Sequence, residues 1–145
     1  MQDEFYKFPL ELNRIFNYDQ LLRCGLGESI SQTIQLIIFS FNGEHRNNYT
    51  LGCQIWDLDF DLIMSVRIWE EKLRMSLLDS ILENVINIEN VDIDVKVSEV
   101  ITTSIGNPHP AIKRHVDISL NAILKQTGEN YHFQTSLYLS PISNL

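Results

Sequence analysis

The spacing of hydrophobic residues changes close to residue 90, and this change constrains the fold more than any other feature of the chain. From Ser65 to about Val85 apolar residues recur every three or four positions, which predicts an amphipathic helix of about five turns. From Val91 to Val97 they recur at every second position, which predicts a strand with one buried and one solvated face. The apolar stripe of the helix consists of Val66, Trp69, Leu73, Leu77, Ile81 and Val85, widened by Leu78 and Leu82.

Two more strands are predicted towards the C-terminus. The segment 105–110 contains glycine and two prolines and is predicted to be a loop. Alternation returns at 116–122 and again at 133–139, with a turn predicted at 127–130 between them. Three consecutive strands with short connections form an antiparallel meander, and helices can pack on one of its faces. The predicted fold class is therefore α+β, with helices packed on one face of a small three-stranded antiparallel sheet.

A second helix is predicted in the N-terminal half. Ser29 is followed three residues later by Gln32, a capping-box pattern that places the start of the helix at Ser29. An isoleucine stripe follows, and the helix is expected to end near Asn42 and Gly43, because glycine tolerates the left-handed conformation that closes a helix. On the longer helix, Glu70 and Arg74 have the i, i+4 spacing of a solvated ion pair.

The chain is predicted to be organised as one domain with an arm. Its 145 residues suffice for one core, so residues 25–145 are assigned to a single α+β domain. Residues 1–24 are too apolar for a solvated tail and are predicted to be a docking arm. Large aromatic side chains dominate protein interfaces. The candidate partner-binding residues are Phe5, Tyr6, Phe8, Phe16 and Trp56.

The charge balance and the lack of long apolar runs exclude several classes of partner. The net charge is -8, from 19 acidic and 11 basic side chains, and no basic cluster is present to neutralise phosphates, so nucleic acid is excluded as the main partner. No apolar run approaches the roughly 20 residues that span a bilayer, so no membrane insertion is expected. The acidic N-terminus does not resemble a secretory signal, and a cytoplasmic location is expected, with Cys24 and Cys53 reduced.

No motif identifies a cofactor or a metal site. The glycines at 25 and 27 precede a helix, but no third glycine or lysine accompanies them, so a turn and cap are favoured over a phosphate site. The histidines and cysteines lack zinc-ligand spacing. Glu44 with Asp57, Asp59 or Asp61 could serve as a glycosidase carboxylate pair. The aspartates also alternate with apolar residues, as the solvated edge of a half-buried segment does, and that interpretation is favoured.

The order of several short segments resembles a known family. Ser29–Phe39 is followed by Gly43-Glu44, then by Leu51–Phe60 with Gly52 and Trp56, a long helix, a strand and a terminal hairpin. This order resembles the baseplate-wedge family of type VI secretion systems (TssE) and contractile phage tails, sometimes labelled lysozyme-like. The similarity covers roughly residues 25 to 140. Four residues match the family motif, namely Gly43, Glu44, Gly52 and Phe60.

The resemblance implies a structural, non-catalytic role without cofactors. It implies a cytoplasmic baseplate component of a contractile injection machine that joins larger wedge proteins (TssF- and TssG-like) to the base of the contractile sheath and tube. The Glu-Pro-Arg signature of the family is absent, since the residues 83–87 at the end of the long helix contain neither Pro nor Arg. The lysozyme-like label leaves one alternative open, a peptidoglycan-cleaving hydrolase that uses Glu44 with Asp57 or Asp59.

Overall fold

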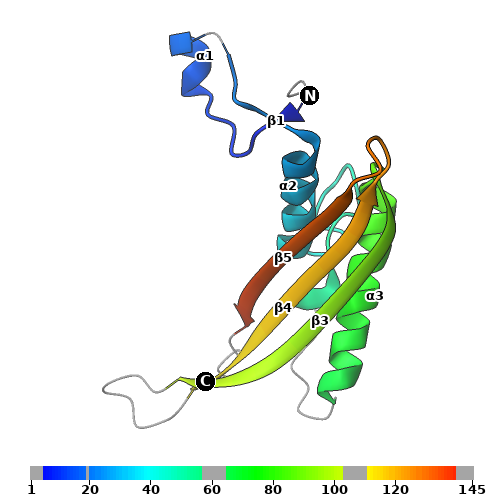
Figure 1. The fold of residues 1–145 in the computed structure, drawn as a ribbon. Helices are drawn as coiled ribbons and strands as arrows, with labels where there is room; N and C mark the ends of the chain where they lie inside the picture. Colours follow the sequence, from blue (N-terminus) through cyan, green and yellow to red (C-terminus); the bar gives the residue numbers. More distant parts are fainter. Residues whose placement is uncertain (1–4, 19, 57–64, 103–110, 140–145) are drawn as a thin grey trace.

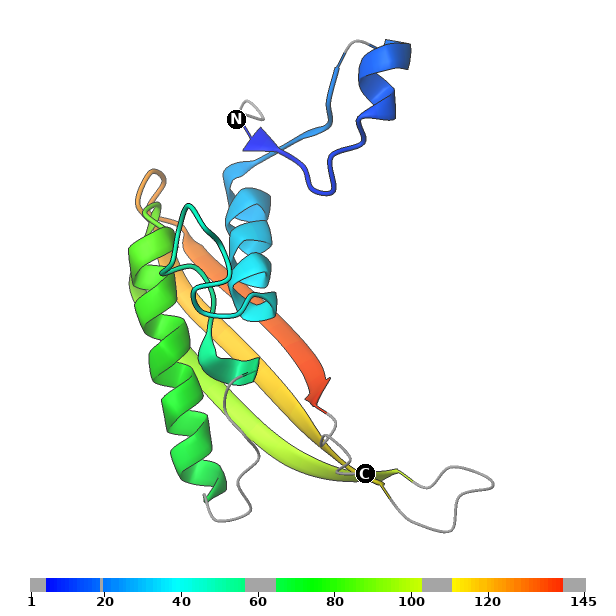
Figure 2. The ribbon, with the colours of Figure 1, turned by 180° about the vertical axis from the view of Figure 1, so that it is seen from behind.

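The computed structural model describes residues 5–18, 20–56, 65–102 and 111–139. A sheet of three antiparallel strands in the order β3-β4-β5 forms the body, and α2 and α3 both lie against the same face of it (Figures 1 and 2). The predicted α+β class and the C-terminal meander are confirmed. The elements of the body are α2 (Leu26–Phe39), the short 3-10 helix η1 (Gln54–Trp56), α3 (Val66–Asn84), β3 (Ile88–Thr102), β4 (Ala111–Leu124) and β5 (Asn130–Leu139).

The predicted long helix corresponds to α3. Ser65 is its N-cap, and the Ser65 hydroxyl accepts a hydrogen bond from the backbone N–H of Ile68 (3.4 Å), which satisfies one otherwise unpaired donor. Its predicted stripe is buried from Trp69 through Ile81, but Leu82 is 58% exposed and does not widen that stripe. Leu82 follows Ile81 directly on a helix that turns 100° per residue, and on this helix that step carries the Leu82 side chain off the buried stripe.

The core lies between the sheet and the two helices. The inward side chains of β4 alternate with solvated ones at the predicted positions Val116, Ile118, Leu120 and Ala122. On the other side of the core α2 contributes four buried isoleucines, which occupy one stripe of the helix. These are Ile30, Ile34, Ile37 and Ile38.

The predicted boundaries of α2 are wrong at both ends. The helix begins at Leu26 with Gly25 as N-cap, and Ser29 lies inside it, its N–H donating to Gly25 O at 3.0 Å. The amide of Gln32 does not close a capping box, because it donates to Cys24 Sγ (3.2 Å) and accepts from the backbone N–H of Phe8. The helix ends at Phe39, since Ser40 is extended and its carbonyl accepts from Cys53 N–H (3.1 Å).

The described residues before α2, from Phe5 onwards, extend beyond the N-terminal end of that helix (Figures 1 and 2). They contain β1 (Phe5–Tyr6), α1 (Asn13–Tyr18) and β2 (Arg23–Cys24), with β1 and β2 paired antiparallel. The Lys7 ammonium lies 2.9 Å from the Glu28 carboxylate on α2. The hydrogen bond to Glu28 and its negative charge raise the pKa of Lys7. This segment is therefore anchored at its two-stranded base, and its far end carries α1.

The predicted ion pair on α3 has a different acidic partner. The guanidinium of Arg74 binds the carboxylate of Glu71 through two contacts of 2.6 and 2.9 Å, at i, i+3 spacing. This charged hydrogen bond lowers the pKa of Glu71. Glu70 instead reaches the sheet, where it accepts a hydrogen bond from the backbone N–H of Val97 (2.8 Å). Among the described residues, no helix combines the length and apolarity needed to cross a membrane.

Candidate functional site

Three of the four family-motif residues meet at one point, the backbone of Ser40 and Phe41 just after α2. Gly43 has φ +80°, and the turn it allows brings Glu44 back onto Phe41. Glu44 closes this turn twice: its carboxylate accepts from Phe41 N–H (2.9 Å) and its own N–H donates to Phe41 O (3.2 Å). The carboxylate of Glu44 is exposed and engaged in a local turn.

Gly52 packs against the same backbone from the other side. Its φ is +121°, and a Cβ atom at this position would lie 2.5 Å from Phe41 O and 2.9 Å from Ser40 O. Only a glycine fits so close to another backbone segment at this φ. The motif Gly-Glu turn and the loop glycine therefore fix how residues 40–53 fold back on α2. Phe60, Asp57, Asp59 and Asp61 lie outside the described residues.

Trp56 extends this cluster to the surface. Its indole N–H donates to Ile38 O (3.0 Å), and its ring lies 6.1 Å from the Phe41 ring at 45°. The side chain of Trp56 is 38% exposed, and its neighbour Phe41 is also exposed. Trp56 is thus both a tether for η1 and an exposed aromatic edge, as a partner-binding residue requires.

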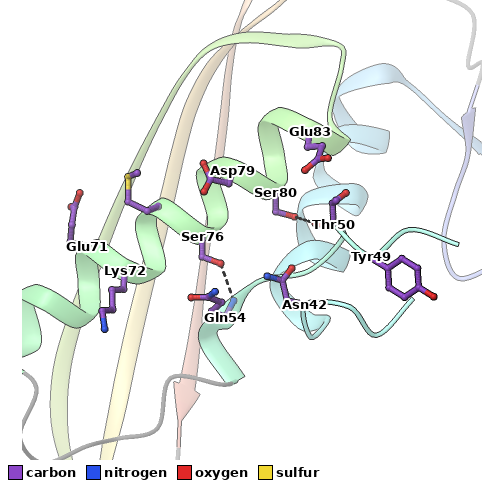
Figure 3. Close-up of a pocket in the computed structure, with 11 residues that line it drawn as sticks. Asn42, Tyr49, Thr50, Gln54, Glu71, Lys72, Ser76, Asp79, Ser80 and Glu83 are labelled. Carbon is purple, nitrogen blue, oxygen red and sulfur yellow. Dashed lines mark hydrogen bonds between the residues drawn. The ribbon is translucent and has the colours of Figure 1, made fainter. Parts of the chain in front are cut away.

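A groove of about 580 Å³ lies between α3 and the loop 42–54, and the sequence patterns did not predict it (Figure 3). A column of small polar residues on α3 holds the loop: Ser76 Oγ accepts from Gln54 N–H, and Ser80 Oγ donates to Thr50 O, both at 3.0 Å. Asn84 continues the column and donates to Thr50 O (3.3 Å). The sequence feature that could have predicted this groove is the four-residue spacing of these three polar side chains, which places them on one face of the helix.

The groove is lined mainly by residues of polar type, several of them acidic, although more of its exposed surface is apolar than polar. Glu71, Asp79 and Glu83 line it together with Lys72. Within the described ranges no group of three or more His, Cys, Asp or Glu side chains is arranged to hold a metal ion. The groove is an open surface cleft and not an enclosed apolar ligand pocket.

The predicted arm carries exposed apolar side chains. Phe16 is 88% exposed, Tyr18 72% and Phe8 62%, whereas Phe5 packs against the core. Arg14 lies over the Tyr18 ring at 5.9 Å and Arg23 over the Tyr6 ring at 5.7 Å. Large apolar side chains gathered on one exposed segment typically mark an interaction surface.

The outer edge of β5 is a second exposed feature of the sheet. No described strand pairs with it on the side away from β4. The β4-β5 hairpin closes with a hydrogen bond from Leu124 N–H to Glu129 O (2.9 Å). Backbone groups point alternately to the two sides of a strand. The backbone N–H of Leu124 therefore points towards β5, and in the strand register those of Tyr131 and every second residue after it point back towards β4. The backbone N–H groups that point away from β4 are those of His132, Gln134, Ser136 and Tyr138.

The remaining candidate residues lie apart from this cluster. Cys24 and Cys53 are both buried, and the Cys53 thiol donates a hydrogen bond to Ile38 O (3.4 Å). His45 shares a hydrogen bond with Ser40 Oγ (3.1 Å) beside the Glu44 turn, and His132 pairs with Asn121 on the solvated face of the sheet (2.8 Å). The structure therefore does not gather the described histidines and cysteines into one site.

Comparison with known proteins gives a similarity of fold. No protein-family model and no curated protein matches the sequence. The structure is similar to the crystal structure of a proposed tail lysozyme from Geobacter sulfurreducens, with a TM-score of 0.62 and 15% sequence identity. The match covers 86% of this chain and 100% of that chain. This chain therefore shares the fold of a proposed tail lysozyme.

Proposed function

We propose that this protein is a structural, non-catalytic component of the cytoplasmic baseplate of a contractile injection machine, of the type VI secretion kind. In this role it bridges two larger wedge proteins and the base of the sheath and tube. The sequence resemblance and the fold shared with a proposed tail lysozyme both support this theme.

The observation that carries the proposal is the exposed apolar arm. Phe8, Phe16 and Tyr18 each leave most of their surface in water on a segment whose base is tied to α2 by Lys7 and by the β1-β2 pairing. Burying a large apolar side chain stabilises by about 1.5–3 kcal/mol, so a partner that covers them gains substantial binding energy. An anchored arm with uncovered aromatic residues suits a subunit that joins other subunits.

The open edge of β5 supports the proposal independently. Outward N–H and C=O groups on an edge strand pair readily with a strand from another chain. In the proposed baseplate, the arm contacts the wedge proteins and the β5 edge contacts the sheath. Two separate contact surfaces on one small domain are what a bridging subunit needs.

The test is affinity purification of the tagged full-length chain from its native cells, with mass spectrometry and stoichiometry. We expect two larger proteins in fixed ratio with the wild-type chain. The double variant Phe8→Ser and Phe16→Ser should lower their recovery at least tenfold, since truncating an aromatic hot-spot residue of an interface costs about 2 kcal/mol or more. The matched control is Ile86→Ser, which removes a 72% exposed apolar side chain from the turn between α3 and β3 and should leave recovery unchanged.

Two results would contradict the proposal. One is a wild-type chain recovered alone and monomeric. The other is equal loss of partners in the Ile86→Ser control, because the loss would then reflect general surface polarity. Deleting residues 1–18 is a harsher version of the same test. It also removes β1 and with it the Phe5 contact to the core, so the double substitution is preferred.

The fold shared with a proposed tail lysozyme supports one alternative, a hydrolase, and the variant Glu44→Gln distinguishes it from the structural role. Glutamine keeps an amide oxygen that can accept from Phe41 N–H, so we expect a melting temperature within about 2 °C of wild type and unchanged partner recovery. We expect no peptidoglycan hydrolysis by either protein. Hydrolysis by the wild type that is abolished in Glu44→Gln would establish the alternative, because a general acid must carry a proton that the amide lacks.

A further inference from the structure

The two edges of the sheet are not equivalent. β3 forms one edge and β5 the other, with β4 between them. Each edge strand has backbone N–H and C=O groups that point away from the sheet, and proteins must protect such groups from unwanted pairing. No described strand pairs with the outer side of β5, whereas an outward backbone group of β3 bonds to a side chain from α3.

Glu70 occupies an outward backbone donor of β3. Its carboxylate accepts from Val97 N–H at 2.8 Å, and both residues are partly buried. The strand register requires the N–H of Val97 to point outward. Lys96 pairs with Asp117, and the backbone N–H and C=O of Lys96 point towards β4. Because these groups alternate along a strand, those of Val97 point to the opposite side of β3, away from β4. The same alternation makes the amide of Val95 an outward donor. A carboxylate on α3 therefore sits where an incoming strand would place a carbonyl.

A second feature interrupts the same edge near its start. The pairing of β3 with β4 shifts register between Glu89 and Asp92, and Asn90 adopts φ +52°. A bulge of this kind bends the strand and breaks the regular spacing of its outward groups, which is a recognised way to protect a sheet edge. The β3 edge thus carries a bulge at one end and a bound carboxylate further along.

We propose that Glu70 closes the β3 edge to strand addition, so that the sheet accepts a partner strand at β5 alone. The inference about β5 rests on the proposed function, in which that edge receives another chain. The inference about Glu70 does not rest on the proposed function. It can be tested with this protein alone, because the β3 strand of a second copy can serve as the added strand. Removal of the carboxylate should therefore allow two copies to join through their β3 edges.

The experiment uses the purified full-length chain and three variants at position 70. Glu70→Ala removes the acceptor, Glu70→Asp withdraws the carboxylate by one methylene group, and Glu70→Gln keeps an acceptor oxygen at the same reach. Glu71→Ala is the matched control, because it removes an exposed carboxylate one residue away that pairs with Arg74. Light scattering after size exclusion gives the mass over a concentration series, and amide hydrogen exchange monitors Val97.

We expect Glu70→Ala and Glu70→Asp to form dimers as concentration rises, while Glu70→Gln, Glu71→Ala and the wild type stay monomeric. In dilute Glu70→Ala the Val97 amide should exchange at least tenfold faster than in wild type. In the dimer the amides of Val95 and Val97 should become protected. The Asp variant keeps the charge and the fold, so it carries the test if the Ala variant does not fold.

Some outcomes would overturn the inference. Monomers at all concentrations in both Glu70→Ala and Glu70→Asp would show that Glu70 makes a structural hydrogen bond and does not guard an edge. Equal association of Glu71→Ala would attribute the effect to lost negative charge. Dimers whose Val95 and Val97 amides remain unprotected would place the contact elsewhere. None of these results bears on partner recovery from cells, so this inference and the proposed function can fail separately.

Discussion

Replacement of Gly52 by alanine should lower the free energy of unfolding by about 3 kcal/mol or more. The new Cβ would lie 2.5 Å from Phe41 O, and the overlap is with backbone, which cannot rotate away. Overpacking of this kind costs about 1–3 kcal/mol, and a non-glycine residue held at φ +121° adds roughly 1–3 kcal/mol of strain. Urea unfolding monitored by circular dichroism measures the loss.

The glycine at position 43 provides the matched control. Gly43 also has a positive φ, +80°, but no atom lies within 4 Å of the position of its missing Cβ. Gly43→Ala should therefore cost only the conformational strain, about 1–2 kcal/mol. Equal losses in the two variants would contradict the close approach of Gly52 to the Ser40–Phe41 backbone, since φ alone would then explain both.

A cavity under α3 should have an effect of similar size. Leu73 is completely buried between α3 and the sheet, and Leu73→Ala should destabilise the protein by about 2–5 kcal/mol through lost apolar burial and the cavity left behind. For a domain of this size each kcal/mol lowers the melting temperature by about 2–4 °C. Calorimetry of the wild type and the variant gives the difference directly.

Leu82→Ala on the same helix is the control for Leu73→Ala. Its side chain is 58% exposed although the sequence pattern placed it beside the buried stripe. Exposed substitutions away from special features usually change stability by less than about 0.5 kcal/mol. A loss above about 2 kcal/mol in Leu82→Ala would mean that this face of α3 is covered, and would contradict the described packing.

The family motif shows how far the sequence leads towards the candidate site. Gly43, Glu44 and Gly52 were selected because they match the motif of the family that the sequence resembles. Their common role around Ser40 and Phe41 could not be predicted, because it depends on a contact between segments about ten residues apart that have no regular period. The arm was likewise predicted from composition, whereas its anchoring through Lys7 and Gln32 to α2 was visible only in the structure.

The sequence alone determined the elements whose residues repeat with the period of the backbone. The extent of α3 and the inward faces of β3 to β5 follow from local geometry, since side chains three or four apart share a helix face and every second one shares a strand face.

Tertiary structure decided how polar side chains are paired. Glu70 has Arg74 at ideal spacing yet bonds Val97 N–H, and Gln32 could have closed a capping box yet bonds the arm. Each of these side chains could form several local interactions of similar free energy. An exposed side-chain pair on a helix contributes only a few tenths of a kcal/mol. A partly buried backbone N–H that lacks an acceptor costs about 1–3 kcal/mol. That larger penalty arises only where distant segments meet, so packing determined these contacts.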